Sequence, residues 1–196
     1  KLGILTVGQL RKADPAVLSQ AMGKRTGHFQ ALARGEDERE VVASRPDKSL
    51  SREVTFEQDI SKPRELLAEL QRQAESVTGR LRSEGLVART IQIKVRDCRF
   101  HTATRSRSLA APTASTEVVF KQARALLKTW LQQHLNTPVR VLGIGLRGLE
   151  EPYERGIEYD TAAQKALDKT LDEIKRRYGD DKATRALALE TGKKTD

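Results

Sequence analysis

Basic and hydroxyl side chains gather in residues 88–109, and their types suit the binding of phosphate groups. Ile91, Ile93 and Val95 alternate with polar residues, which is the period of a strand with one buried face. Two adjacent strands with basic residues on one face can bind phosphates, although a solvated basic hairpin would show the same pattern. The cations, set against the single acid Asp97, are Arg89, Lys94, Arg96, Arg99, Arg105 and Arg107.

A second candidate phosphate site is a short basic turn near the N-terminus. The turn contains Gly23, Lys24 and Arg25 and follows a helix expected over residues 15–21. Backbone N–H groups at such a turn can hold a DNA phosphate, and the two basic side chains would add charge. An ordinary helix C-cap explains the glycine equally well, so both interpretations stay open.

Catalytic and metal-binding residues are not expected in this chain. The one cysteine, Cys98, excludes an internal disulfide and a cysteine-based zinc site. His28, His101 and His134 are far apart and lack the spacing of metal ligands. No paired carboxylates, nucleophile with a base, or glycine-rich phosphate loop can be recognised. We therefore predict no catalytic residue, no metal ion and no cofactor.

The overall charge favours a polyanionic partner. The 196 residues carry a net charge of +9 and have a sequence pI of about 9.8, which suits nucleic acid or an acidic membrane surface. No apolar run approaches the roughly 20 residues that a membrane span needs, and no secretory signal is present, so we expect a cytoplasmic protein without a membrane partner. Because the chain does not begin with Met, we expect it to be part of a longer protein.

Strand and helix patterns follow one another in the order βαββαβ, which predicts a ferredoxin-like α+β fold. Alternating residues predict strands from Ser49, through residues 90–96 and over 139–149, and apolar residues at three- and four-residue spacing predict the two helices. Both helices would cover one face of a four-stranded sheet and leave the other face open. We expect that open face to carry Ser49, Ser51, Lys94, Arg96, Arg105 and Arg107.

Composition divides the chain into four parts. Residues 1–35 read as short helices, and residues 36–48 are charged without a sustained apolar period, as in a linker. Residues 49–150 form the predicted α+β domain, and residues 151–196 form a C-terminal helix and tail. One side of that helix carries a narrow apolar stripe that can pack on a neighbouring element, made of Ala163, Leu167, Leu171, Ile174 and Tyr178.

Several segments resemble the Y-family DNA polymerases, most closely the bacterial DinB type. The thumb end, the linker and the little-finger entry of that family resemble LGILTVGQL at residues 2–10, LARGED at 32–37 and KSLSREVTF at 48–56. The family's last little-finger strand resembles VRVLGIGL at 139–146, and its C-terminal helix and glycine turn resemble IKRRYGDD at 174–181. The likeness covers nearly the whole chain, and three motifs in the same order and spacing make it specific.

The resemblance implies a partial helical thumb, a tether, and a little finger whose open sheet face lies in the DNA major groove. It implies a part in DNA synthesis past lesions, with primer–template duplex DNA as the partner of a monomeric bacterial protein at the nucleoid. The residues that match the family's DNA-contacting motifs are Ser49, Ser51 and Arg52 in the first strand, Thr104, Arg105, Ser106 and Arg107 in the third strand, and Gly23, Lys24 and Arg25 in the thumb.

Two departures from the family pattern limit what the resemblance implies. The family's catalytic palm corresponds to sequence upstream of Lys1, so Mg²⁺ is expected only there and the chain alone should be inactive. Asp180 and Asp181 are no substitute, because they follow a C-terminal helix. The family's sliding-clamp peptide has a Gln and an aromatic residue, and Leu-Ala-Leu at residues 187–189 matches it only in part. Clamp binding is therefore an additional prediction that the tail motif supports weakly.

Two alternatives of other classes stay open. The first is a catalytically inactive polymerase paralogue that acts as a scaffold in a mutagenesis complex, for which the C-terminal helix and tail would be the functional part. The second is an RNA-binding βαββαβ module of the RRM kind, which stacks bases on aromatic residues of its central strands. Residues 90–96 contain no aromatic residue, and Phe100 lies at the expected hairpin turn, which disfavours this second alternative.

Overall fold

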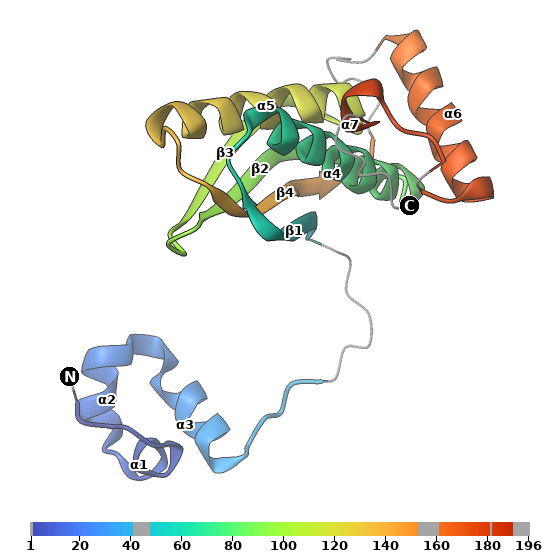
Figure 1. Cartoon of the computed structure of the whole chain (residues 1–196). Helices are drawn as coiled ribbons and strands as arrows, with labels where there is room; N and C mark the ends of the chain where they lie inside the picture. The colour runs from blue at the N-terminus through green and yellow to red at the C-terminus, as the bar shows by residue number, and fades with distance from the viewer. Residues whose placement is uncertain (1, 41–47, 153–160, 181, 190–196) are drawn as a thin grey trace. The chain divides into compact units, whose positions relative to one another are not determined.

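The computed structural model of the chain describes residues 2–40, 48–152, 161–180 and 182–189. It divides into two compact units, Lys1–Arg45 and Pro46–Asp196 (Figure 1). Residues 36–40 of the predicted linker have no regular secondary structure, and residues 41–47 of that linker lie outside the described residues. The finer division of the chain into four parts stays a prediction.

The first unit is a small helical segment with little buried surface. A capping box begins its first helix, since the Thr6 hydroxyl accepts from the Gln9 N–H and the Gln9 side chain accepts from the Thr6 N–H. Gln30 joins the helices by donating to the carbonyl oxygens of Leu10 and Ala13, at 3.3 and 2.8 Å. Its elements are α1 (Val7–Lys12), α2 (Pro15–Met22), the 3₁₀ helix η1 (Gly23–Arg25) and α3 (Thr26–Arg34).

The second unit has the predicted α+β fold, with its elements in the order βαββαβ and two helices on a four-stranded antiparallel sheet. Its antiparallel sheet has the strand order β1-β4-β2-β3, and α4 and α5 lie on the same side of it (Figure 1). Two further helices, α6 and α7, follow the sheet. The elements are β1 (Ser49–Ile60), α4 (Pro63–Ser83), β2 (Val87–Asp97), β3 (Thr102–Thr113), α5 (Thr116–Gln133), β4 (Val139–Glu150), α6 (Ala162–Tyr178) and α7 (Ala186–Leu189).

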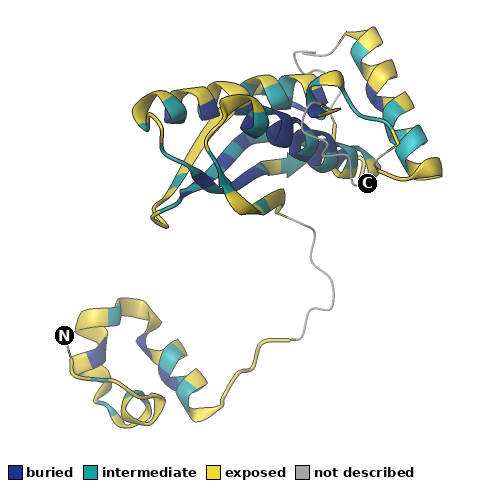
Figure 2. Ribbon diagram, in the orientation of Figure 1, coloured by how far each residue is buried: buried dark blue, intermediate teal, exposed yellow. Residues whose placement is uncertain are grey.

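The hydrophobic core lies between the sheet and its two covering helices (Figure 2). Trp130 of α5 is 1% exposed and anchors this core, as the leucines around it predict. Burial of apolar surface supplies the main stabilisation. Because the helices cover only one face of the sheet, only the side chains on that face of each strand need to be apolar. The sheet contributes buried side chains from Leu50, Ile91, Ile93, Val95, Leu142, Ile144 and Leu146. Among the described residues, no helix has the length and apolarity to cross a membrane.

The C-terminal strap, which we define as α6 and α7, packs against α4 through charged groups. Asp168 is the buried residue of α6, and the Arg82 guanidinium lies between it and Asp172 with N–O distances of 3.3 and 2.6 Å. The apolar stripe predicted for this helix is only partly buried, since Leu167 is 49% and Tyr178 65% exposed. The expectation of apolar packing is therefore wrong for Ala163, Leu167 and Tyr178, because the ion pairs of Arg82 set the rotation of α6, whereas Leu171 and Ile174 are half-buried.

Asp168 is held in its ionised form despite being buried. Burial acts to raise its pKa, but the Thr116 N–H and the guanidinium groups of Arg185 and Arg82 outweigh burial and hold the pKa below its ordinary value. The Thr116 N–H donates to Asp168 Oδ2 at 3.0 Å, so the acid also binds the first turn of α5.

Glu75 of α4 forms the second buried anionic centre of the strap. Burial again acts to raise its pKa, and bonds from Lys175, the Arg185 N–H and the Thr184 hydroxyl lower it below its ordinary value. The three donor–acceptor distances are 2.8, 3.0 and 2.7 Å. Both α6 and the segment before α7 are thereby bound to α4 by one carboxylate.

We expect Asp168→Asn to lower the free energy of unfolding of the second unit by about 3 kcal/mol at pH 7, because two guanidinium groups lose their buried anion. The folded-state pKa is lowered, so the carboxylate stabilises the fold above its unfolded pKa of about 3.9, and this contribution is lost as pH falls through the lower folded value. Urea unfolding followed by Trp130 fluorescence measures both effects.

Glu173→Gln on the same helix is the matched control, since Glu173 is exposed and pairs across one helical turn with Arg177. This change should alter stability by less than about 0.5 kcal/mol. Equal effects of the two substitutions, or a penalty for Asp168→Asn that does not shrink as pH is lowered, would contradict the role of the buried charge.

Candidate nucleic-acid interface

Cross-strand pairing determines which side chains share a face, because directly paired residues of an antiparallel sheet project to the same side. We call the side away from α4 and α5 the open face. Its polar character follows from four rows of paired residues. The rows are Ser49, Arg147, Thr90 and Ser108; Ser51, Gly145, Gln92 and Ser106; Glu53, Gly143, Lys94 and Thr104; and Thr55, Val141, Arg96 and Thr102.

Positive charge exceeds negative charge on the open face, where three cations face the one acid of these rows, Glu53. Lys94 Nζ donates to Glu53 Oε2 at 2.8 Å across β4, in a pair that is partly exposed. Arg96 Nε donates to Thr102 Oγ1 at 2.8 Å, which extends the guanidinium along the sheet. Arg147 is exposed. A surface of this kind offers phosphates both charge and hydroxyl donors.

Two glycines leave the middle of the open face without side chains. A Cβ on Gly143 would lie 2.8 Å from the Glu53 Cβ and 3.3 Å from the Arg52 carbonyl oxygen. A Cβ on Gly145 would have ordinary contacts, the nearest being the Ser51 Cβ at 3.7 Å. The strand that pairs with both β1 and β2 therefore has no side chains of its own at these two positions. Gly143 is buried where the Lys94–Glu53 pair crosses β4, whereas Gly145 is partly exposed and lets a ligand backbone approach.

Arg105 and Arg107 lie on the helix side of β3, so the expectation that they share the open face with Lys94 and Arg96 is wrong. They pair with Ile93 and Ile91, whose side chains are buried under the helices. Arg107 Nη1 also donates to Gln122 of α5 at 2.9 Å. The hairpin turn sets this register, and a shift of one residue would place every side chain on the opposite face.

Arg52 also lies on the helix side, at the other edge of the sheet. It pairs with Ile144 of β4, and its Nη1 donates to Ser76 Oγ of α4 at 2.9 Å. Because β1 and β3 are the edge strands, Arg52, Arg105 and Arg107 stay exposed beside the covering helices. Inward-pointing charges at edges also hinder pairing with another sheet.

The structure brings together most of the other predicted residues. Ser49, Ser51, Thr104 and Ser106 are exposed and occupy the same open face as Lys94 and Arg96. The turn of Gly23, Lys24 and Arg25 belongs to the first unit, where it forms η1. Both of its basic residues are exposed, and Gly23 has a positive φ of 59°.

Arg147 is the main open-face residue that sequence reasoning missed. It follows Gly143 and Gly145 at two-residue spacing in the predicted last strand, so strand alternation would have placed it on their face. Thr90, Gln92, Thr102 and Ser108 complete the same rows. Arg89, which the alternation places on the buried side, lies at a register shift between β2 and β3 and pairs with Glu150 at 2.9 Å instead.

Metal ligands are not gathered anywhere in the part of the chain that the structure describes. Within those residues no three or more His, Cys, Asp or Glu side chains lie together as a metal site would need. The residues present therefore do not fit the metal ions that the resemblance assigns to a catalytic palm, and we derive no catalytic step for this chain.

Comparison with known sequences gives a consistent family. Residues 47–167 match the impB/mucB/samB family C-terminal domain. A DNA polymerase IV of Dehalococcoides mccartyi (strain CBDB1) is 36% identical over 180 residues, which cover 91% of this chain and 46% of that protein. A DNA polymerase IV of Streptomyces coelicolor (strain ATCC BAA-471 / A3(2) / M145) is 38% identical over 167 residues, covering 85% of this chain and 34% of that protein. The chain thus spans less than half the length of these curated relatives.

A solved structure has the same fold. The Y-family DNA polymerase chimera Dbh-Dpo4(243-245)-Dbh has a TM-score of 0.61 and 17% sequence identity to this chain, covering 77% of it and 43% of the chimera. At that identity the likeness concerns the fold alone. It agrees with the α+β sheet and helices of the second unit.

The two open-face glycines generate a paired prediction. Gly143→Ala should lower the free energy of unfolding by about 1–3 kcal/mol, because its Cβ would overlap the Glu53 Cβ across the sheet. Gly145→Ala should change it by less than about 1 kcal/mol, since its Cβ meets only ordinary contacts. Urea unfolding of both variants measures the difference, and equal stabilities would contradict the close approach at Gly143.

Proposed function

Since the chain belongs to the impB/mucB/samB family and is similar to DinB-type Y-family DNA polymerases, we propose a DNA-binding role for its second unit. This unit is the little finger that grips primer–template duplex DNA. The observation that carries this proposal is the open face, where hydroxyl groups and three cations surround a glycine-lined centre. The parent protein would be a lesion-bypass polymerase, with its catalytic palm elsewhere in the sequence.

The proposed grip acts on phosphates rather than on base edges. Ser, Thr, Lys and Arg side chains on a sheet donate to phosphate oxygens of any sequence, and the charged ones release counterions. The partly exposed Gly145 would let the sheet lie close in the major groove. A polymerase that accepts distorted templates benefits from such a grip, because lesions alter bases more than the phosphate backbone.

The edge arginines extend the proposed surface around the sheet. Arg105 and Arg107 project to the helix side of β3, whereas Thr104 and Ser106 project to the open face. One DNA strand that follows the β3 edge would therefore meet hydroxyl groups on one side and guanidinium groups on the other. Arg52 would act in the same way at the β1 edge, and Lys24 and Arg25 would add a separate contact from the thumb turn.

Clamp binding by residues 187–189 stays a prediction, and it would require this segment to leave its packing site on α4. Ala188 is 3% exposed, and its carbonyl oxygen accepts from Arg72 of α4 at 2.7 Å. A clamp that bound this segment would compete with its packing on α4.

The four rows of the open face contain no aromatic residue, which favours the DNA grip over an RNA-binding module of the RRM kind.

Replacing Lys94, Arg96 and Arg147 together by Ala should weaken binding to duplex DNA of every sequence. The slope of log K against log salt should become shallower by about 0.9 for each phosphate that the variant no longer neutralises. Fluorescence anisotropy of labelled primer–template DNA at several salt concentrations measures both quantities. The matched control removes the same charge from exposed residues of α5 by replacing Lys121, Arg124 and Lys128 with Ala. An equal weakening in that control would show that net charge, not the open face, accounts for binding.

A second test concerns the edge arginines. Replacing Arg105 and Arg107 together by Ala should weaken binding several-fold for all sequences alike, since each side chain serves phosphates. Competition between unrelated duplexes of equal length measures sequence dependence, and thermal unfolding checks that removal of the Arg107–Gln122 bond leaves the fold intact. A weakening confined to one duplex sequence would refute phosphate contacts by these residues.

A further inference from the structure

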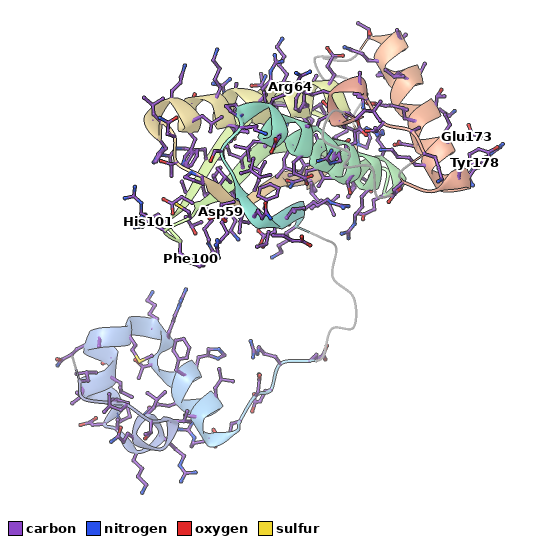
Figure 3. All side chains as sticks on the ribbon, viewed as in Figure 1. Asp59, Arg64, Phe100, His101, Glu173 and Tyr178 are labelled. Atoms are coloured by element: carbon purple, nitrogen blue, oxygen red, sulfur yellow. The ribbon has the colours of Figure 1, made fainter. Side chains whose placement is uncertain are left out.

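The turn between β2 and β3 presents an aromatic ring in an unusual backbone conformation. Phe100 has a positive φ of 66°, which a bulky residue adopts only at a cost that glycine avoids. Figure 3 shows Phe100 and His101 at the tip of this hairpin, near Asp59. A strained residue that the surrounding turn holds in place is a reason to look for a function of its side chain.

Several hydrogen bonds hold the turn in this shape. Asp97 Oδ1 accepts from the backbone N–H groups of Arg99 and His101 at 2.8 and 2.9 Å. The Phe100 N–H donates to the Asp97 carbonyl oxygen at 3.0 Å, and the Cys98 N–H donates to the Pro138 carbonyl oxygen at 3.0 Å. The ring is therefore presented by a fixed backbone, so little conformational entropy would be lost when it meets a ligand.

The Phe100 ring has a cation on one face and is 63% exposed. The Arg140 guanidinium carbon lies 4.8 Å from the ring centroid, and Arg140 Nε donates to Asp59 Oδ1 at 3.1 Å. A guanidinium plane over one face supports the ring and leaves its exposed surface available for stacking. An aromatic ring next to arginines is the usual composition of a platform for nucleic-acid bases.

The surroundings of the tip connect it to the open face. Arg96 and Thr102 form the last open-face row before the turn, and Arg99 is exposed within it. The two acids at the tip, Asp59 and Asp97, are already bound to Arg140 and to the turn itself. The tip therefore presents both positive charge and an apolar ring to a polyanion, at one end of the proposed DNA surface.

We propose that Phe100 is a stacking platform for an unpaired base of single-stranded DNA next to the duplex that the open face binds. This inference rests on the proposed function of the open face. Paired bases inside a duplex already have both faces covered, so a ring at the end of the surface can stack only on a base beyond the junction. Stacking tolerates any base, which agrees with a grip that does not read sequence.

The test uses Phe100→Trp in the full chain. The natural Trp130 is 1% exposed and so contributes a constant signal, whereas Trp at position 100 would be exposed and quenched when a base stacks on it. We expect quenching with a primer–template that carries a single-stranded overhang and none with the blunt duplex. Anisotropy of the labelled DNA, recorded on the same samples, reports binding itself.

Tyr178→Trp is the matched control, because Tyr178 is an aromatic residue with 65% exposure on α6, distant from the tip (Figure 3). Its fluorescence should not respond to the overhang. Binding without quenching at position 100, or equal quenching at position 178, would overturn the stacking platform while leaving the proposed grip intact. Absence of binding by anisotropy would instead refute the grip on which the platform depends.

A second pair of variants separates stacking from a purely structural role. Phe100→Ala should bind the overhang DNA about fivefold or more weakly and the blunt duplex unchanged. Phe100→Gly should show the same selective weakening, although glycine relieves the backbone strain and so preserves the turn. Equal weakening for both DNAs, or unchanged affinity for both, would refute the platform, and the latter result would assign the ring to a protein partner or to the fold.

Discussion

Cross-strand pairing in the four-stranded sheet is the constraint on which the arrangement of the candidate DNA-binding residues depends. Residues 90–96 of β2 project alternately into the core and onto the open face. Each residue of β3 or β4 that pairs with β2 projects to the same side as its partner. Burial of Ile91, Ile93 and Val95 fixes this alternation, because a slip of one residue would expose all three. Lys94 and Arg96 are therefore held on the open face by the apolar side chains between them.

The sequence was sufficient for the fold because the fold depends on patterns that local chemistry enforces. The period of two in residues 90–96 and the three- and four-residue spacing in α4 both predicted elements that the structure contains. The positions of Arg105 and Arg107 could not be derived, because they depend on the number of residues in the turn before β3. The polar packing of Asp168 was equally hidden, since a buried acid shows no pattern until its partner Arg82 is known.

The C-terminal strap shows how a polar helix can belong to a compact unit. Its buried acid lies against α4 and α5, where Arg82 and the Thr116 N–H provide opposite charge and a hydrogen bond. Such pairs contribute little net stability compared with apolar packing, but they penalise any other rotation of the helix. The strap therefore gains its specificity from charge, whereas the sheet gains its specificity from alternating apolar burial.

The second unit thus has two systems of charge that differ in their access to water. Asp168 and Glu75 are 2% and 5% exposed, whereas Arg147 and the edge arginines face solvent. At 0.1 M ionic strength, mobile ions largely screen the interactions of exposed charges that lie more than about 10 Å apart, and they screen buried pairs much less. Raising the ionic strength would consequently weaken contacts with a polyanion, while the buried ion pairs would keep the strap bound to α4. Salt would therefore weaken the contacts proposed for the open face without loosening the buried ion pairs of the strap.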